Sequence, residues 1–347
     1  MATSLSRRAI LQGAAALTGS AVGLPRHAIG ADRLQFAGVN IAGAEFGKVP
    51  GTYTKDYIYP SDDNIAYFAG LGFNLIRVPF LWERMQPKLS APLDQDEQAR
   101  LMAAVRSASA RGMRIVLDTH NYAKRRIAND DWATEYLIGS TQVPAGAFAD
   151  YCGRLARAFK NEAAAIFGLM NEPAQIEAEA WLQIANAGVA RIRAENAPQL
   201  VFVPGVAYTG AHSWLSAHND LMAKFVDPAK NFVFEVHQYL DQDSSGTSPV
   251  AVSNRIGSER IAAFQSWARA NGFRAFLGEF GASSDSVSLE ALRDLCETMA
   301  ANPDVWIGWS AWAAGSWWAN DYMFKLDDAD GTIRPQTKIL SEFARRI

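Results

Sequence analysis

The sequence predicts a single α/β domain folded as a (β/α)8 barrel, the TIM barrel. Eight short apolar runs alternate with longer helical patterns along the 347-residue chain. The runs are almost continuously hydrophobic, as expected for parallel strands that are buried on both faces. An open doubly wound sheet is the main rival fold, and it often carries a Gly-x-Gly-x-x-Gly loop after its first strand. The residues after the first run, Asn40-Ile41-Ala42-Gly43-Ala44, lack that loop.

The predicted strands and helices alternate regularly. The strands cover residues 34–40, 75–80, 114–120, 165–171, 200–204, 232–237, 274–279 and 306–312. The clearest helical patterns cover residues 94–111, 145–160, 177–195, 254–271 and 289–301, and a last helix is expected at 336–346. The longest irregular stretches, at about 43–61, 121–144 and 240–253, each follow a strand. In a barrel they would surround the C-terminal face, where the active sites of this fold lie.

The first 30 residues have the layout of an export signal. Arg7 and Arg8 precede an uncharged stretch rich in Ala and Gly, and small residues follow near Ala31. This order is typical of a signal peptide, and the paired arginines indicate the twin-arginine type. We therefore expect a signal peptide at residues 1–30, a catalytic barrel at residues 31–347, and a secreted or periplasmic protein.

The bulk composition narrows the range of partners. A formal net charge of −3 provides no basic surface for nucleic acid, and no later stretch is apolar enough to span a membrane. There is no Cys-x-x-Cys or His-Glu-x-x-His pattern, so we expect no metal or cofactor. Cys152 and Cys296 would lie on opposite sides of the barrel, too far apart for a disulfide. We expect two free, buried thiols and a monomer.

Two glutamates stand at the ends of predicted strands. Glu172 follows Asn171 at the end of the fourth strand, and Glu279 ends the seventh. A buried acid is costly unless it is solvated or functional, and both would lie on one face of the barrel. Cleavage of a glycosidic bond needs one carboxyl that protonates the leaving oxygen and a second carboxyl across the sugar. The pair therefore predicts a glycosidase.

Other polar residues at the strand ends allow more than one interpretation. Arg77 interrupts the second apolar run, and it either forms a structural ion pair or holds a functional carboxylate in its ionised form. His120, at the end of the third strand, is either a core imidazole or a site residue. His237 is the last residue of the sixth strand, and Tyr239 follows it two residues later.

Seven segments in order along the chain resemble glycoside hydrolase family 5, in its bacterial and fungal endoglucanase subfamily. They are residues 38–43, 76–80, 118–122, 168–173, 208–214, 278–281 and 312–316. The resemblance implies that Glu172 is the acid/base and that Glu279 is the nucleophile. It also implies that Arg77 and Tyr239 support Glu279. The two cysteines are fewer than fungal members of the family often have.

The resemblance assigns supporting and substrate-binding roles as well. Asn171 would bond the sugar 2-hydroxyl, and His237 would sit beside the acid/base. His120 would contact sugar hydroxyls, Trp312 would be the stacking floor beside the cleavage point, and Trp214 would be an aromatic on the leaving-group side.

The implied activity is that of a retaining endo-β-1,4-glucanase, which hydrolyses β-glucan by double displacement. A β-mannanase or a xyloglucanase could use the same residues, so these substrates remain alternatives. A non-catalytic carbohydrate-binding barrel is a remote alternative, because both glutamates are present with their supports. A barrel enzyme that uses metal or phosphate is disfavoured, because ligand clusters and a Gly-rich phosphate loop are missing from the sequence.

Overall fold

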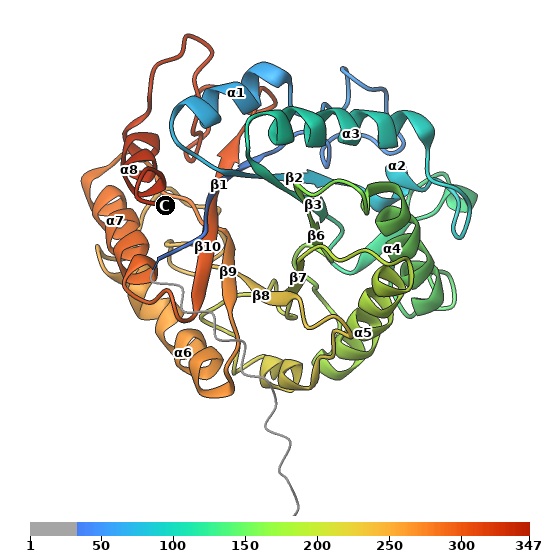
Figure 1. The fold of residues 1–347 in the computed structure, drawn as a ribbon. Coiled ribbons are helices and arrows are strands. Elements are labelled where there is room, and N and C mark those ends of the chain that lie inside the picture. The colour runs from blue at the N-terminus through green and yellow to red at the C-terminus, as the bar shows by residue number, and fades with distance from the viewer. Residues whose placement is uncertain (1–32) are drawn as a thin grey trace, which may run out of the picture. The chain divides into compact units, whose positions relative to one another are not determined.

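Residues 33–347, which the computed structural model describes, contain a closed barrel of eight parallel strands with helices around it (Figure 1). The strands are β1 (Phe36–Ile41), β2 (Leu75–Phe80), β3 (Arg114–Thr119), β6 (Ala165–Gly168), β7 (Val201–Pro204), β8 (Phe232–His237), β9 (Ala275–Glu279) and β10 (Trp306–Ala314). They pair in the order β1-β10-β9-β8-β7-β6-β3-β2, and the pairing of β2 with β1 closes the ring. The predicted fold class is confirmed.

The helices cover the outside of the barrel, mostly where the sequence patterns predict them. They are α1 (Asp62–Gly70), α2 (Trp82–Met85), α3 (Gln95–Ala110), α4 (Ala145–Phe159), α5 (Ala178–Ala194), α6 (Ile256–Asn271), α7 (Ser286–Ala300) and α8 (Pro335–Ala344). The α1 and α2 helices were not among the predicted ones. A short 3-10 helix, Asn219–Lys224, stands between β7 and β8, where the helical pattern is weak. Ser61 begins α1 with a capping box that satisfies free backbone donors.

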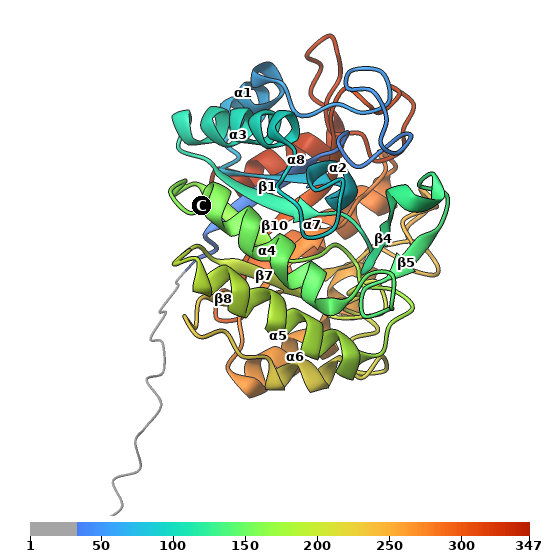
Figure 2. The same ribbon diagram turned by 90° about the vertical axis from the view of Figure 1, so that its right-hand side faces the viewer.

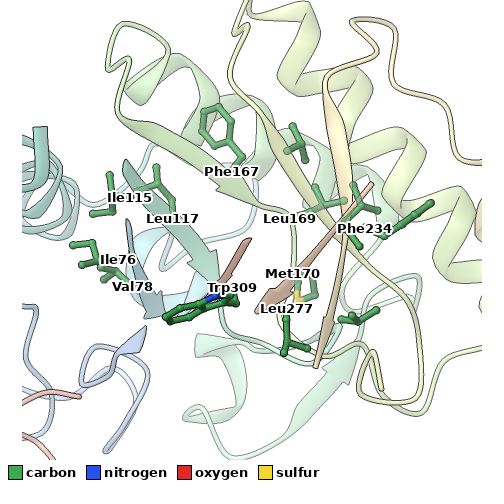
Figure 3. Close-up of a cluster of buried hydrophobic side chains, with 14 of the residues drawn as sticks. Ile76, Val78, Ile115, Leu117, Phe167, Leu169, Met170, Phe234, Leu277 and Trp309 are labelled. Atoms are coloured by element: carbon green, nitrogen blue, oxygen red, sulfur yellow. The ribbon is translucent and has the colours of Figure 1, made fainter. Parts of the chain in front are cut away.

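Side chains of the strands alternate between the barrel interior and the outer helical layer. Leu75, Val116 and Val233 belong to a small apolar cluster drawn from seven of the barrel strands, which fills the interior. Their neighbours in sequence pack in the larger cluster between strands and helices, part of which Figure 3 shows. Because strand side chains alternate with period two, the next inward positions after these three residues are Arg77, Asp118 and Glu235. Arg77, Asp118 and Glu235 therefore form a charged layer inside the barrel, directly above the apolar layer.

Two details differ from the predicted elements. The fourth barrel strand, β6, ends at Gly168, so residues 169–171 form the loop that leads to Glu172 rather than strand. The stretch 121–144 is not wholly irregular, because it contains a small antiparallel hairpin of β4 (Lys124–Arg126) and β5 (Glu135–Leu137), visible in Figure 2. These short segments are rich in charged residues and lack the apolar alternation that makes a strand recognisable.

The two thiols behave as predicted, since Cys152 and Cys296 are both free and buried. The predicted signal peptide, residues 1–30, lies outside the described residues and stays a prediction. Over residues 33–347, none of the helices has the combination of length and apolar character that crossing a bilayer requires.

Candidate active site

The two glutamates meet at the C-terminal end of the barrel. Glu279 is the last residue of β9, and Glu172 follows the loop after β6. One carboxylate oxygen of each lies within 4.8 Å of the other. The Nδ1 atom of His237 lies 2.7 Å from Glu172 and 3.7 Å from Glu279. The backbone of Glu172 has a φ of 43°, in the left-handed region that non-glycine residues seldom adopt. Strain of this kind is frequent at functional sites.

Each oxygen of the Glu279 carboxylate has its own donor. Arg77 Nη1 donates to Oε1 at 2.8 Å, and the Tyr239 hydroxyl donates to Oε2 at 2.8 Å. All three side chains are buried, so the charge-assisted bonds are well shielded from water. These two donors fix the orientation of the carboxylate and stabilise its negative charge.

Arg77 is completely buried and joins several carboxylates. Its guanidinium forms ion pairs with Asp118 at 3.1 Å, with Glu235 at 2.9 Å and with Glu279 at 2.8 Å. Burial lowers the pKa of the Arg77 guanidinium, but the charges of the three carboxylates raise it more, so the net shift of the pKa is upward. Arg77 Nη1 also donates to the side-chain oxygen of Asn40 at 2.9 Å. Arg77 therefore forms the ion pairs that the structural interpretation expects, and it also contacts the Glu279 carboxylate, as the functional interpretation requires.

Glu172 is in a different environment. Burial raises the pKa of its carboxyl group, the bond with His237 Nδ1 at 2.7 Å lowers it, and the charge of Glu279 raises it further. The net direction is upward, as an acid catalyst requires. Burial lowers the pKa of His237, but Glu279 and the bond with Glu172 raise it more, to about 10. His237 is therefore protonated at neutral pH.

Glu172, His237 and Glu279 also have a spacing that could hold a metal ion. A metal ligand must be a deprotonated imidazole, and the raised pKa of His237 works against that form. The Nδ1 atom of His237 is already engaged in the hydrogen bond with Glu172 at 2.7 Å. The arrangement therefore fits a proton-handling pair better than a metal centre.

A pocket that reaches His120, a neighbour of Asn171, is lined by polar and aromatic side chains. It has a volume of about 210 Å³, and His120, Tyr122 and Trp312 are part of its wall. His120 Nδ1 lies 2.7 Å from Asp118, and its Nε2 lies 3.2 Å from the Asn171 side-chain nitrogen. The rings of His120 and Trp312 stack with centroids 5.8 Å apart. Apolar ring faces beside hydrogen-bonding groups are suited to the two kinds of surface that a sugar presents.

Asn171 connects the pocket with the charged layer. Its side-chain oxygen accepts a hydrogen bond from Arg77 Nη2 at 2.8 Å. Its side-chain nitrogen faces His120, and the residue is buried. The amide is therefore oriented by two neighbours, next to Glu172.

The prediction for Trp214 is wrong. Its side chain is 0% exposed and packs against Phe234, Phe264 and Trp267, with ring centroids 5.0 to 5.6 Å apart. A ring enclosed by other rings cannot stack on a sugar, so its role is in the core. Tyr208, on the same loop after β7, is 56% exposed. The chain folds back after β7, and the sequence pattern does not reveal which aromatic turns inward.

Four residues of the site were not assigned a role from the sequence. Asp118 and Glu235 lie two residues after inward-facing apolar residues, so the period of the strands could have placed both beside Arg77. Asn40, the next-to-last residue of β1, comes two residues after Gly38 rather than after an apolar side chain, so it had no comparable signal. Glu45 lines the pocket, its Oε2 accepts from the backbone of Gly43 at 2.7 Å, and burial raises its pKa to about 7.

A barrel with two close glutamates at its C-terminal end, one bound to a cation and the other to a histidine, has the equipment of a glycoside hydrolase. Comparison with known families agrees. The profile of Cellulase (glycosyl hydrolase family 5) matches residues 34–315, and the chain belongs to this family.

Two similar proteins are named endo-beta-1,4-glucanases, and the structure of a third contains cellopentaose. Endo-beta-1,4-glucanase B of Aspergillus niger is 37% identical over 323 residues, which are 92% of this chain and 93% of the relative. The structure of an endo-beta-1,4-glucanase from Xanthomonas axonopodis pv. citri is 46% identical, has a TM-score of 0.86, and is matched over 90% of this chain and 99% of its own. XacCel5A in complex with cellopentaose is 45% identical, with a TM-score of 0.86 and coverage of 89% and 99%.

Proposed function

We propose that this glycoside hydrolase is a retaining endo-β-1,4-glucanase that cleaves internal bonds of β-glucan through a covalent glycosyl-enzyme. The observation that carries the mechanism is the distance within 4.8 Å between oxygens of Glu172 and Glu279. In retaining enzymes the two carboxyl groups are about 5–5.5 Å apart, and one of them attacks the sugar directly. In inverting enzymes the two groups are farther apart and leave room for a water. The names of the relatives and the cellopentaose bound to XacCel5A support the substrate class.

In the first step, Glu279 attacks the anomeric carbon and Glu172 gives its proton to the glycosidic oxygen. The bond between that carbon and oxygen breaks, an ester with Glu279 forms, and the shortened glucan leaves as an alcohol. The two donors on Glu279 hold its carboxylate for attack, and they keep it from turning toward Glu172.

In the second step, Glu172 takes a proton from a water that attacks the anomeric carbon. The ester bond breaks, and Glu279 recovers its charge. The pKa of Glu172 follows this cycle, because the charge of Glu279 is one of the causes that raise it. Esterification removes that charge, so the pKa of Glu172 falls when the residue must act as a base.

The remaining site residues have roles in binding. In this proposal Asn171, which Arg77 orients, bonds the sugar 2-hydroxyl, an interaction that strengthens in the transition state. His120 bonds neighbouring hydroxyls and Trp312 lies under the sugar ring, and both roles are supported by the position of these residues in the pocket wall. We further propose that the enzyme acts as an exported monomer without metal or cofactor, on polysaccharide rather than on nucleic acid or membrane.

Hydrolysis of a substrate panel tests the proposal. We expect release of reducing sugar from carboxymethylcellulose, no comparable release from mannan, and unchanged activity after dialysis against a chelator. Faster hydrolysis of mannan or xyloglucan would replace the substrate assignment. Glu279→Gln should abolish turnover and leave binding of cello-oligosaccharides intact. A Glu279→Gln enzyme that keeps wild-type rates would overturn the mechanism.

A further inference from the structure

The loop after β8 is organised around one buried carboxylate, that of Asp241. The residue is 2% exposed. Its oxygens accept hydrogen bonds from the backbone nitrogens of Gly246 at 3.0 Å, Thr247 at 3.1 Å and Ser248 at 3.1 Å. The hydroxyl of Ser245 adds a fourth bond at 3.2 Å. This stretch was expected to be irregular, and it is irregular but tightly held.

The same loop is fastened to helix α6. Arg260 Nη1 donates to the backbone oxygen of Asp241 at 2.6 Å and to that of Tyr239 at 2.8 Å. One guanidinium therefore holds the start of the loop together with the backbone of Tyr239, whose hydroxyl bonds Glu279.

Gly246 brings the loop against the ring of Tyr239. It has a φ of 70°, and a Cβ atom placed there would lie 2.6 Å from Cδ1 and 2.7 Å from Cε1 of that ring. Phe324 also packs on the ring, with centroids 6.0 Å apart and planes 18° apart. Only a residue without a side chain allows the backbone to approach so closely.

Resting on the proposed function, we infer that Asp241 and Gly246 are positioning residues for the nucleophile. Asp241 folds the loop so that Gly246 supports the Tyr239 ring, and the ring holds its hydroxyl 2.8 Å from Glu279. Asp241 is buried, and Gly246 has no side chain with which to bond a sugar. Asp241 and Gly246 affect catalysis only through the hydroxyl of Tyr239. An effect through this one group can be measured separately from a general loss of stability.

A double-mutant cycle between Gly246→Ala and Tyr239→Phe tests the inference, because residues that act through one contact are not additive. With an aryl β-cellotrioside as substrate, we expect Gly246→Ala to lower kcat at least tenfold and to change KM less than twofold. In the Tyr239→Phe background, the same substitution should change kcat less than twofold. Effects that multiply in the double variant would overturn the inference.

Gly272→Ala is the matched control. Gly272 also has a φ of 70°, but nothing lies within 4 Å of the position of its added Cβ, so the variant has the backbone strain without the ring contact. It should keep kcat within twofold of wild type. Should Gly246→Ala fail to fold, the same cycle is run with Asp241→Asn, which keeps the side-chain size and weakens the loop bonds. Additive effects of Asp241→Asn and Tyr239→Phe would equally refute the inference.

The cycle also separates this inference from the proposed function. A wild-type enzyme that cleaves mannan instead of β-1,4-glucan refutes the substrate assignment, and the cycle is then measured on an aryl β-mannoside. A wild-type enzyme that cleaves the cellotrioside, with additive effects in the cycle, refutes only the positioning role.

Discussion

Replacement of Arg77 by lysine tests the charged layer more directly than any other substitution. The guanidinium contacts three carboxylates and the side-chain oxygens of two asparagines, all at 2.8 to 3.1 Å. Its donors point in several directions from a planar fork. A lysine ammonium keeps the positive charge, but it offers three donors from one point and cannot reach every partner.

The magnitude follows from the contacts that are lost. If two of the five contacts are broken, at about 1.5–3 kcal/mol for each hydrogen bond to a charged group, Arg77→Lys costs about 3–6 kcal/mol of folding free energy. At about 2 °C for each kcal/mol, appropriate to a large domain, the melting temperature should fall by about 6–12 °C. Loss of the bond to Glu279 should also lower kcat by roughly tenfold or more.

The assay is thermal unfolding followed by circular dichroism, together with kcat on carboxymethylcellulose. Arg269→Lys is the control, because Arg269 pairs with Asp304 through side chains that are about half exposed. Such a surface pair is worth about 0–1 kcal/mol, so the control should melt within about 2 °C of wild type. If Arg77→Lys melts as the control does and keeps its kcat, the reasoning about the charged layer is wrong.

Four further predictions concern single side chains. Glu172→Ala should lose activity on poor leaving groups, and azide should restore part of it, because azide attacks the glycosyl-enzyme without a base. NMR should identify a β-glycosyl azide, and its absence would count against the acid/base role. Trp214→Ala should lower the free energy of unfolding, measured in urea, by about 3–5 kcal/mol. Its KM should stay within twofold of wild type, and a large rise in KM would restore the binding role of Trp214. Trp312→Ala should raise KM for oligosaccharides about tenfold, because its ring face is lost to the sugar, and an unchanged KM would remove it from the site. In the folded protein the pKa of Glu45 is raised from 4.5 to about 7. Between these two pH values the unfolded chain loses the proton first, so the folding stability falls as the pH rises. Glu45→Gln should therefore be more stable than wild type at pH 8, by up to about 3 kcal/mol, and closer to wild type at pH 4.5; an equal difference at both pH values would show that Glu45 does not titrate in this window.

Much of the fold was predictable because it depends on local pattern. Buried parallel strands must be apolar on both faces, and this requirement made all eight barrel strands visible in the sequence. Their ends were less certain: β6 stops at Gly168, three residues before its predicted end. The apolar residues of 169–171 continue the pattern of the strand, but they lie in the loop that turns Glu172 toward Glu279.

The sequence by itself determined the barrel and the two glutamates at the ends of its strands, since strand period and strand order place both on one face. Only the tertiary structure decided which groups surround them. It brought Asp118 and Glu235 to Arg77, and it enclosed Trp214 in the core. The physical reason is range: hydrophobic period is a local property, whereas a charge partner or a packing neighbour is set by distant segments that the closed barrel brings together.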